Sequence, residues 1–140
     1  MDILINEIKK LSKYDFPDKE VYNLLDHSVL PKKDIKDYIH YDDTKYTRHL
    51  IYKNDLFELL IMCWKPGQKA PVHGHEGEKC FMRVEEGSLQ FTNYTLESTS
   101  PLTMREINST RGDSGFLDGP ADLHSVENNF SDNAITFHVY

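Results

Sequence analysis

Residues 66–91, PGQKAPVHGHEGEKCFMRVEEGSLQF, decide how this chain is expected to fold. They contain His73 and His75, followed by Cys80 and a turn at Gly87. In a strand, residues i and i+2 point to the same face, so both imidazoles should face one side with Gly74 outward. Two imidazoles placed in this way can bind one metal ion, and a further ligand can come from a distant strand.

Strand patterns continue on both sides of this stretch. Residues 46–54, 56–64, 71–75, 79–96, 104–119 and 134–140 predict strands, separated by Gly, Asn and Asp turns. We expect hairpin turns at residues 53–55 and at residues 85–88, EEGS. Residues 56–64, LFELLIMCW, are apolar on both alternations apart from Glu58, which indicates a strand covered on both faces.

The first 44 residues carry a helical pattern instead. An apolar stripe with helical spacing is formed by Leu4, Ile5, Ile8 and Leu11, and two further helices are expected over residues 16–30 and 31–41. We therefore predict a single, mainly β domain over residues 1–140. It comprises an N-terminal helical layer, residues 1–44, and a small β-barrel, residues 45–140.

Composition limits the class of partner. The net charge of −7 argues against a surface for nucleic acid or an anionic membrane, because both need a basic patch. No apolar run approaches the roughly 20 residues of a membrane helix, and the first residues do not resemble a secretory signal. Two cysteines without an export signal indicate a reduced, cytoplasmic protein. We expect a monomer with small-molecule partners.

A third metal ligand must come from elsewhere in the chain. The remaining histidines are His27 and His40 in the helical part, His49 in an early strand, His124 after a turn, and His138 in the last strand. His124 is our first choice. The pair His73 and His75 alone is also compatible with surface or hydrogen-bonded histidines.

Cys80 is open to three interpretations. Its thiolate could ligate a metal, which would favour zinc, or the residue could be buried and inert. The third possibility depends on the chain end, where Thr136, His138 and Tyr140 share one face of the last strand. Barrel closure could then bring Tyr140 opposite Cys80, and a cysteine beside a tyrosine and an iron site can form a thioether crosslink.

The spacing of these residues resembles a known superfamily. Gly67 precedes His73 by six positions and Gly87 follows Cys80 by seven, as in the first motif of the cupins. His124 followed by Asn128 resembles the end of the second cupin motif. The resemblance implies a jelly-roll-like barrel, although many cupins carry a glutamate ligand where this chain has Cys80.

Within the cupins, the chain resembles the cysteine dioxygenases. The matching pieces are YTRHL, LLIMCW, HGHEGEKCF, LHSVEN and FHVY. The resemblance implies oxidation of L-cysteine by O2 to cysteine sulfinic acid at iron(II). It implies iron held by His73, His75 and His124, the substrate carboxylate bound by Arg48, a pocket lined by Tyr46 and Trp64, a Cys80–Tyr140 thioether crosslink, and His138 orienting the Tyr140 hydroxyl.

The chain departs from the family at three places. Thr136 replaces a serine and keeps its hydroxyl, Asp122 stands where a glycine is usual, and members commonly continue past the tyrosine. One alternative is a 3-mercaptopropionate dioxygenase, although that group tends to carry glutamine where this chain has Arg48. Others are a cupin that isomerises or senses a ligand with zinc, manganese or nickel, and an inactive cupin used for protein contacts.

Overall fold

The computed structural model describes residues 1–28, 30–74, 79–120 and 123–140. The helices are α1 (Asp2–Ser12), α2 (Asp18–His27), α3 (Lys32–Ile35) and the 3-10 helix η1 (Lys36–Tyr38). The strands are β1 (Thr47–Lys53), β2 (Glu58–Trp64), β3 (Lys69–His73), β4 (Phe81–Glu86), β5 (Leu89–Thr99), β6 (Leu102–Gly112), β7 (Leu117–Asp118), β8 (Leu123–Glu127) and β9 (Ala134–Val139). Within these ranges, no helix has the length and apolarity needed to cross a membrane.

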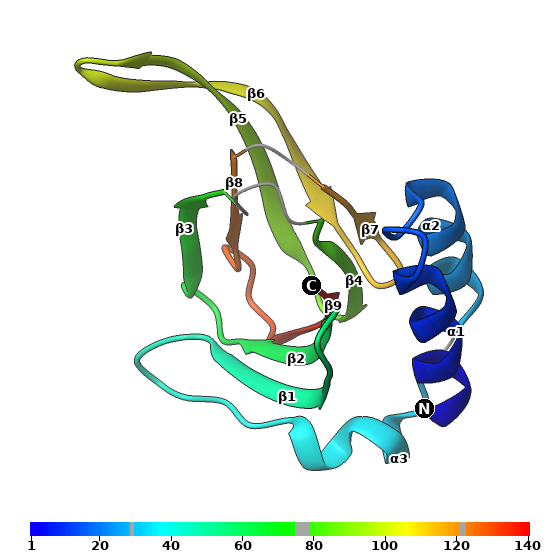
Figure 1. Ribbon diagram of the computed structural model, residues 1–140. Helices are drawn as coiled ribbons and strands as arrows, with labels where there is room; N and C mark the ends of the chain where they lie inside the picture. Colours follow the sequence, from blue (N-terminus) through cyan, green and yellow to red (C-terminus); the bar gives the residue numbers. More distant parts are fainter. Residues whose placement is uncertain (29, 75–78, 121–122) are drawn as a thin grey trace.

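The strands form two sheets. One has the order β1-β2-β9-β4-β7 and the other the order β3-β8-β5-β6, and their strand pairs are antiparallel. The helices lie against the first sheet, while the second sheet lies on the other side, with the long β5–β6 hairpin extending away from the body (Figure 1). The predicted class, mainly β with an N-terminal helical layer, is confirmed, with two facing sheets in place of a fully closed barrel.

Alternation along β2 explains how one strand serves two cores. Leu59, Ile61 and Cys63 pack into a cluster with the buried side chains of the helices, and each is fully buried. Met62 and Trp64 point the opposite way, into a second cluster between the sheets. The prediction that this strand is covered on both faces is therefore confirmed, and Cys63 lies in the helix-facing core.

The predicted hairpin at residues 85–88 is wrong. β4 belongs to the five-stranded sheet and β5 to the four-stranded sheet, so this turn carries the chain from one sheet to the other. Gly87 makes the change of direction with a φ of 79°, and a Cβ there would lie 2.4 Å from the carbonyl oxygen of Asn133. Only glycine fits this turn. The hairpin predicted at residues 53–55 is confirmed, because β1 pairs with β2.

Two other elements differ from the prediction. The third helix has only four residues before it tightens into η1, where a longer helix was expected. The segment 104–119 is divided, because β6 ends at Gly112 and the chain turns before β7. Strand β8, which carries His124, was not predicted.

Candidate metal centre and substrate cavity

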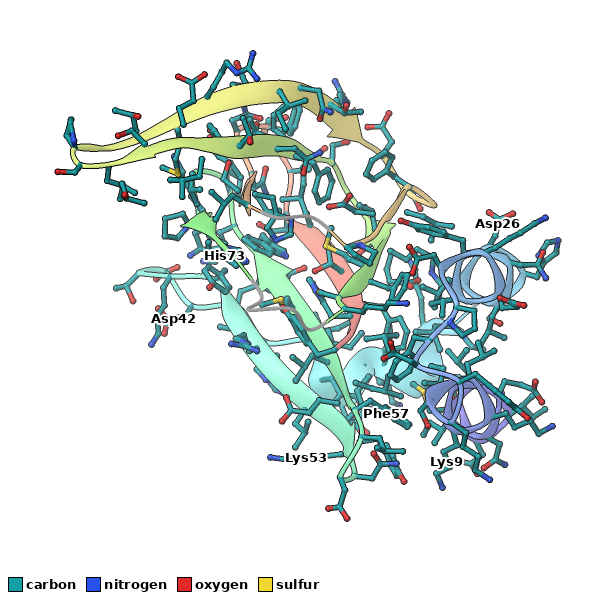
Figure 2. The ribbon with its side chains drawn as sticks, turned by 45° about the horizontal axis from the view of Figure 1, so that its top comes forward. Lys9, Asp26, Asp42, Lys53, Phe57 and His73 are labelled. Carbon is teal, nitrogen blue, oxygen red and sulfur yellow. The ribbon has the colours of Figure 1, made fainter. Side chains whose placement is uncertain are left out.

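His73 and His124 meet between two strands of the smaller sheet. β3 pairs with β8 so that His73 is directly opposite His124. Their Nε2 atoms are 3.1 Å apart and their ring centroids are 4.6 Å apart. His73 lies at the end of β3, on the side of the sheets away from Asp26 of the helical layer (Figure 2). His124, our first choice as third metal ligand, thus lies directly beside His73.

The hydrogen bond of His73 determines its tautomer. Its Nδ1 donates to the carbonyl oxygen of Pro71 at 2.7 Å, so a neutral ring carries its lone pair on Nε2. On the other ring, Nδ1 of His124 lies 3.6 Å from Oδ2 of Asp118. An imidazole whose outer nitrogen faces a carbonyl or carboxylate is the usual arrangement of a metal-ligating histidine. Asp118 was not recognised from the sequence, because the two-residue strand β7 that it ends has no distinctive pattern.

A cavity of about 340 Å³ opens beside the two histidines. The predicted site residues that line it are Tyr46, Arg48, Trp64, His73, Cys80, His124, His138 and Tyr140, together with Met62, Met82 and Asp118. The register of the larger sheet explains this convergence, since Arg48 pairs with Met62 and Met62 pairs with Thr136. These residues therefore point to the same face.

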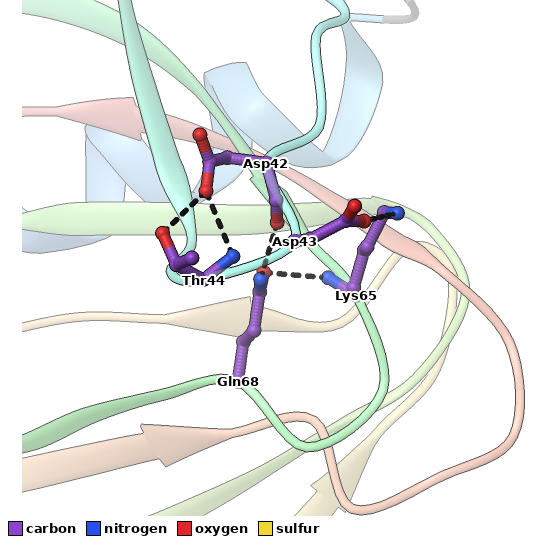
Figure 3. A network of polar contacts seen from close by, with 5 residues as sticks. All are labelled: Asp42, Asp43, Thr44, Lys65 and Gln68. Atoms are coloured by element: carbon purple, nitrogen blue, oxygen red, sulfur yellow. Dashed lines mark hydrogen bonds and ion pairs between the residues drawn. The ribbon is translucent and has the colours of Figure 1, made fainter.

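Tyr46 and Trp64 form the apolar wall of the cavity. Their rings are stacked with centroids 4.5 Å apart. The turns beside them are joined by Gln68, whose amide donates to the carbonyl oxygen of Asp42 at 2.6 Å and accepts from the Lys65 backbone at 2.8 Å (Figure 3). This network holds the start of β1 against the end of β2, and so fixes the stacked pair.

Cys80 lies opposite Tyr140. β4 and β9 pair Phe81 with Val139, and one more step of this antiparallel register places Cys80 beside Tyr140. The two side chains are hydrogen bonded, and burial raises the pKa of the Cys80 thiol to about 12. Burial, followed by the charge of Cys80, also raises the pKa of the Tyr140 hydroxyl. Without a bound metal, both groups are therefore protonated near neutral pH.

Arg48 and His138 complete the surroundings of Tyr140. The guanidinium carbon of Arg48 lies 5.6 Å from the centroid of the Tyr140 ring, and the His138 ring stacks on the same tyrosine at 5.6 Å. His138 Nε2 is bonded to Oγ1 of Thr136 at 2.7 Å, and that oxygen accepts from Trp64 Nε1 at 3.0 Å. The threonine therefore keeps the hydroxyl contact expected of a serine at this position.

Several predicted or candidate residues contribute nothing to this centre or cannot be placed in it. His75 and Asp122 lie outside the described residues. The rings of His40 and His49 contact each other, with centroids 5.3 Å apart, and His27 is hydrogen bonded to the backbone of its own helix. Across residues 1–28, 30–74, 79–120 and 123–140, no cluster of three or more His, Cys, Asp or Glu side chains is arranged to hold a metal ion.

Solved structures with this architecture define the class. The chain is similar to a cupin superfamily protein from Desulfitobacterium hafniense, with a TM-score of 0.55 and 9% identity over 72% of this chain and 81% of that chain. It is also similar to an uncharacterized conserved protein with a double-stranded β-helix domain from Klebsiella pneumoniae. There the TM-score is 0.63, with 14% identity over 81% of this chain and 83% of that chain. The fold is that of a cupin.

A more specific match comes from the sequence family. The family model for cysteine dioxygenase type I matches residues 4–140, and the chain belongs to this family. It is 28% identical to cysteine dioxygenase type 1 of Rattus norvegicus over 108 residues, 74% of this chain and 54% of that protein. It is 27% identical to cysteine dioxygenase type 1 of Danio rerio over 131 residues, which is 87% of this chain and 64% of that protein. The chain thus spans between about half and two thirds of the length of these curated relatives.

Proposed function

We propose that this protein is an iron(II)-dependent thiol dioxygenase that converts L-cysteine and O2 into cysteine sulfinic acid. The observation that carries the proposal is the opposed pair of Nε2 atoms of His73 and His124, 3.1 Å apart, in a cavity that Arg48 and Tyr140 also line. Family membership supports the same activity.

The two histidines fit a metal ion. Two nitrogen ligands about 2.1 Å from one metal and at right angles are about 3.0 Å apart, close to the spacing of these Nε2 atoms. His73 presents a lone pair there, because its Nδ1 donates to Pro71. His75 is proposed as the third ligand on the family resemblance. Bound to these neutral imidazoles, iron(II) would supply uncompensated positive charge for an anionic thiolate and a site for O2.

The remaining cavity residues would bind and orient the substrate. Arg48 offers a planar two-pronged donor to the substrate carboxylate. The Tyr140 hydroxyl, whose pKa is raised by burial, can donate a hydrogen bond towards the same part of the cavity. Trp64, Tyr46 and Met62 form an apolar wall on one side of the cavity. A Cys80–Tyr140 thioether would lock this tyrosine, with one hydrogen from each residue passing to O2.

The test is O2 uptake by the iron(II)-loaded protein with L-cysteine, 3-mercaptopropionate and cysteamine in parallel, with products identified by mass. We expect cysteine to be preferred and to gain two oxygen atoms. His124→Ala should abolish both iron binding and uptake. His49→Ala is the matched control, because His49 bonds to Thr47 outside the cavity and should leave both unchanged. No uptake with any thiol, despite bound iron, would refute the proposal.

A further inference from the structure

Asp118 presents a carboxylate to the histidine pair from the opposite sheet. It ends the two-residue strand β7 and pairs with Met82 of β4. Its Oδ2 lies 3.6 Å from Nδ1 of His124, and the two side chains are 19% and 9% exposed. This carboxylate therefore faces the outer nitrogen of the ring whose Nε2 points at His73.

The helical layer limits how far Asp118 can move. The next residue, Gly119, has no room for a side chain, since a Cβ there would lie 1.6 Å from the hydroxyl oxygen of Tyr22. Tyr22 comes from α2 and packs edge-on against Phe81, with ring centroids 5.6 Å apart. The end of β7 is therefore held between α2 and the cavity, and Asp118 is kept at the cavity wall.

The charge of Asp118 acts on groups in the helical layer and on groups that line the cavity. It raises the pKa of Tyr22, after the larger effect of burial, and it contributes in the same direction at Cys80. On the cavity side lie the rings of His73 and His124, which are neutral when they bind a metal. One carboxylate at this position offsets part of the charge of a divalent cation.

We propose that Asp118 is a positioning residue for the metal centre. Its carboxylate accepts the Nδ1 proton of His124, which fixes the tautomer with a lone pair on Nε2, opposite that of His73. The present separation of 3.6 Å is longer than a hydrogen bond, so the proposed contact requires the two side chains to move closer together. The inference rests on the proposed function for the presence of a metal, but it concerns metal affinity and not the oxidation step.

The experiment measures the affinity of the protein for iron(II) under anaerobic conditions, by competition with a chelator. Asp118→Ala should weaken binding by roughly 10–100-fold, the usual cost of losing a carboxylate behind a metal-ligating histidine. Asp118→Asn should weaken it less, because the amide oxygen still accepts the proton. Activity at limiting iron should fall with affinity and recover at saturating iron. A purely structural role would not produce this recovery.

Asp113→Asn is the matched control. Asp113 is an exposed carboxylate in the preceding turn, bonded to Ser88 and Arg111, and its loss should not change iron affinity. Thermal unfolding of the metal-free variants checks the fold, and Asp118→Asn preserves the side-chain volume if Asp118→Ala is unstable. The inference would be overturned if both Asp118 variants fold and bind iron as the wild type does. If the alanine variant does not fold, unchanged iron affinity of Asp118→Asn would overturn it. If the wild type binds iron but oxidises no thiol, the proposed function fails while the Asp118 comparison remains decisive.

Discussion

Substitution of Arg83 by methionine should strongly destabilise the fold without touching the cavity. Arg83 is only 6% exposed and lies on β4, on the side of the larger sheet that faces the helices. Its Nε is 2.7 Å from Oε1 of Glu85, and its Nη1 donates to the carbonyl oxygens of Leu25 and Ser28 at the end of α2. One side chain thus joins the sheet to the helical layer and neutralises the Glu85 carboxylate, whose side chain is 13% exposed.

The size of the effect follows from this burial. Removing one partner of a buried ion pair costs about 3–5 kcal/mol, because the other charge is left without compensation. Methionine fills most of the aliphatic volume of arginine, so a cavity adds little. A domain of this kind has a total stability of about 5–15 kcal/mol, and the loss is therefore a large fraction of it. By contrast, Arg105→Met, which removes an exposed pair with Glu97, should change stability by less than about 1 kcal/mol.

The loss should depend on pH with a definite sign. Burial raises the pKa of Glu85, and Arg83 opposes this rise. Without Arg83 the folded-state pKa rises further above the unfolded value. A raised pKa gives stability that is present below the unfolded pKa and is lost as pH rises through the folded pKa. The deficit of Arg83→Met should therefore be greatest at neutral pH and shrink as pH falls towards the ordinary glutamate pKa of about 4.3.

The assay is urea denaturation of wild type, Arg83→Met and Arg83→Met/Glu85→Gln at neutral and at acidic pH. Comparing variants at one pH cancels the titration of other groups. The double variant should recover roughly half or more of the loss at neutral pH, because the uncompensated charge is gone. Equal stability of the single and double variants at both pH values would show that the charge of Glu85 is not what Arg83 stabilises, and would refute the reasoning.

Three other substitutions test separate features. Arg48→Gln should lower kcat/KM for L-cysteine by roughly 5–30-fold in O2 uptake. The kcat/KM for cysteamine, which lacks the carboxylate, should not change. Because Arg48 is exposed, solvent screening keeps the effect smaller than that of a buried arginine. Lys79→Met removes donors 2.9 and 3.1 Å from two carbonyl oxygens in the α1–α2 turn, so amide hydrogen exchange there should accelerate, and unchanged protection would contradict the contact. Gly87→Ala should cost about 1–3 kcal/mol or more in urea denaturation, since φ is 79° and a backbone oxygen blocks the new methyl group.

Periodicity predicted the fold well where burial is two-sided. In β2 the continuous apolar run required cover on both faces, and the structure provides the helices on one face and the second sheet on the other. Periodicity could not show which strands pair. Residues 85–88 have the composition of a hairpin, yet the chain changes sheets there, because turn residues specify a reversal but not the partner of the next strand.

The site was predicted unevenly for the same reason. His73, His124, Cys80 and Tyr140 could be grouped because their spacing resembles a family pattern, and the described ones do meet around one cavity. Asp118 carries no such signal. Its proximity to His124 depends on β7 pairing with β4 across the larger sheet, a contact between residues that no local pattern connects.

β9 shows why the candidate site and the core cannot vary independently. Along this strand, Thr136 and His138 face the cavity side, while Ile135, Phe137 and Val139 pack with the helices. Because side chains alternate, a shift of one residue in this central strand would exchange the two sets. The pairing of β9 with β2 on one side and with β4 on the other opposes the shift, so the burial of the helix-facing residues also fixes where the polar face points. The helical layer, which supplies no cavity-lining residue among those described, thus contributes to the candidate site by holding β9 in register.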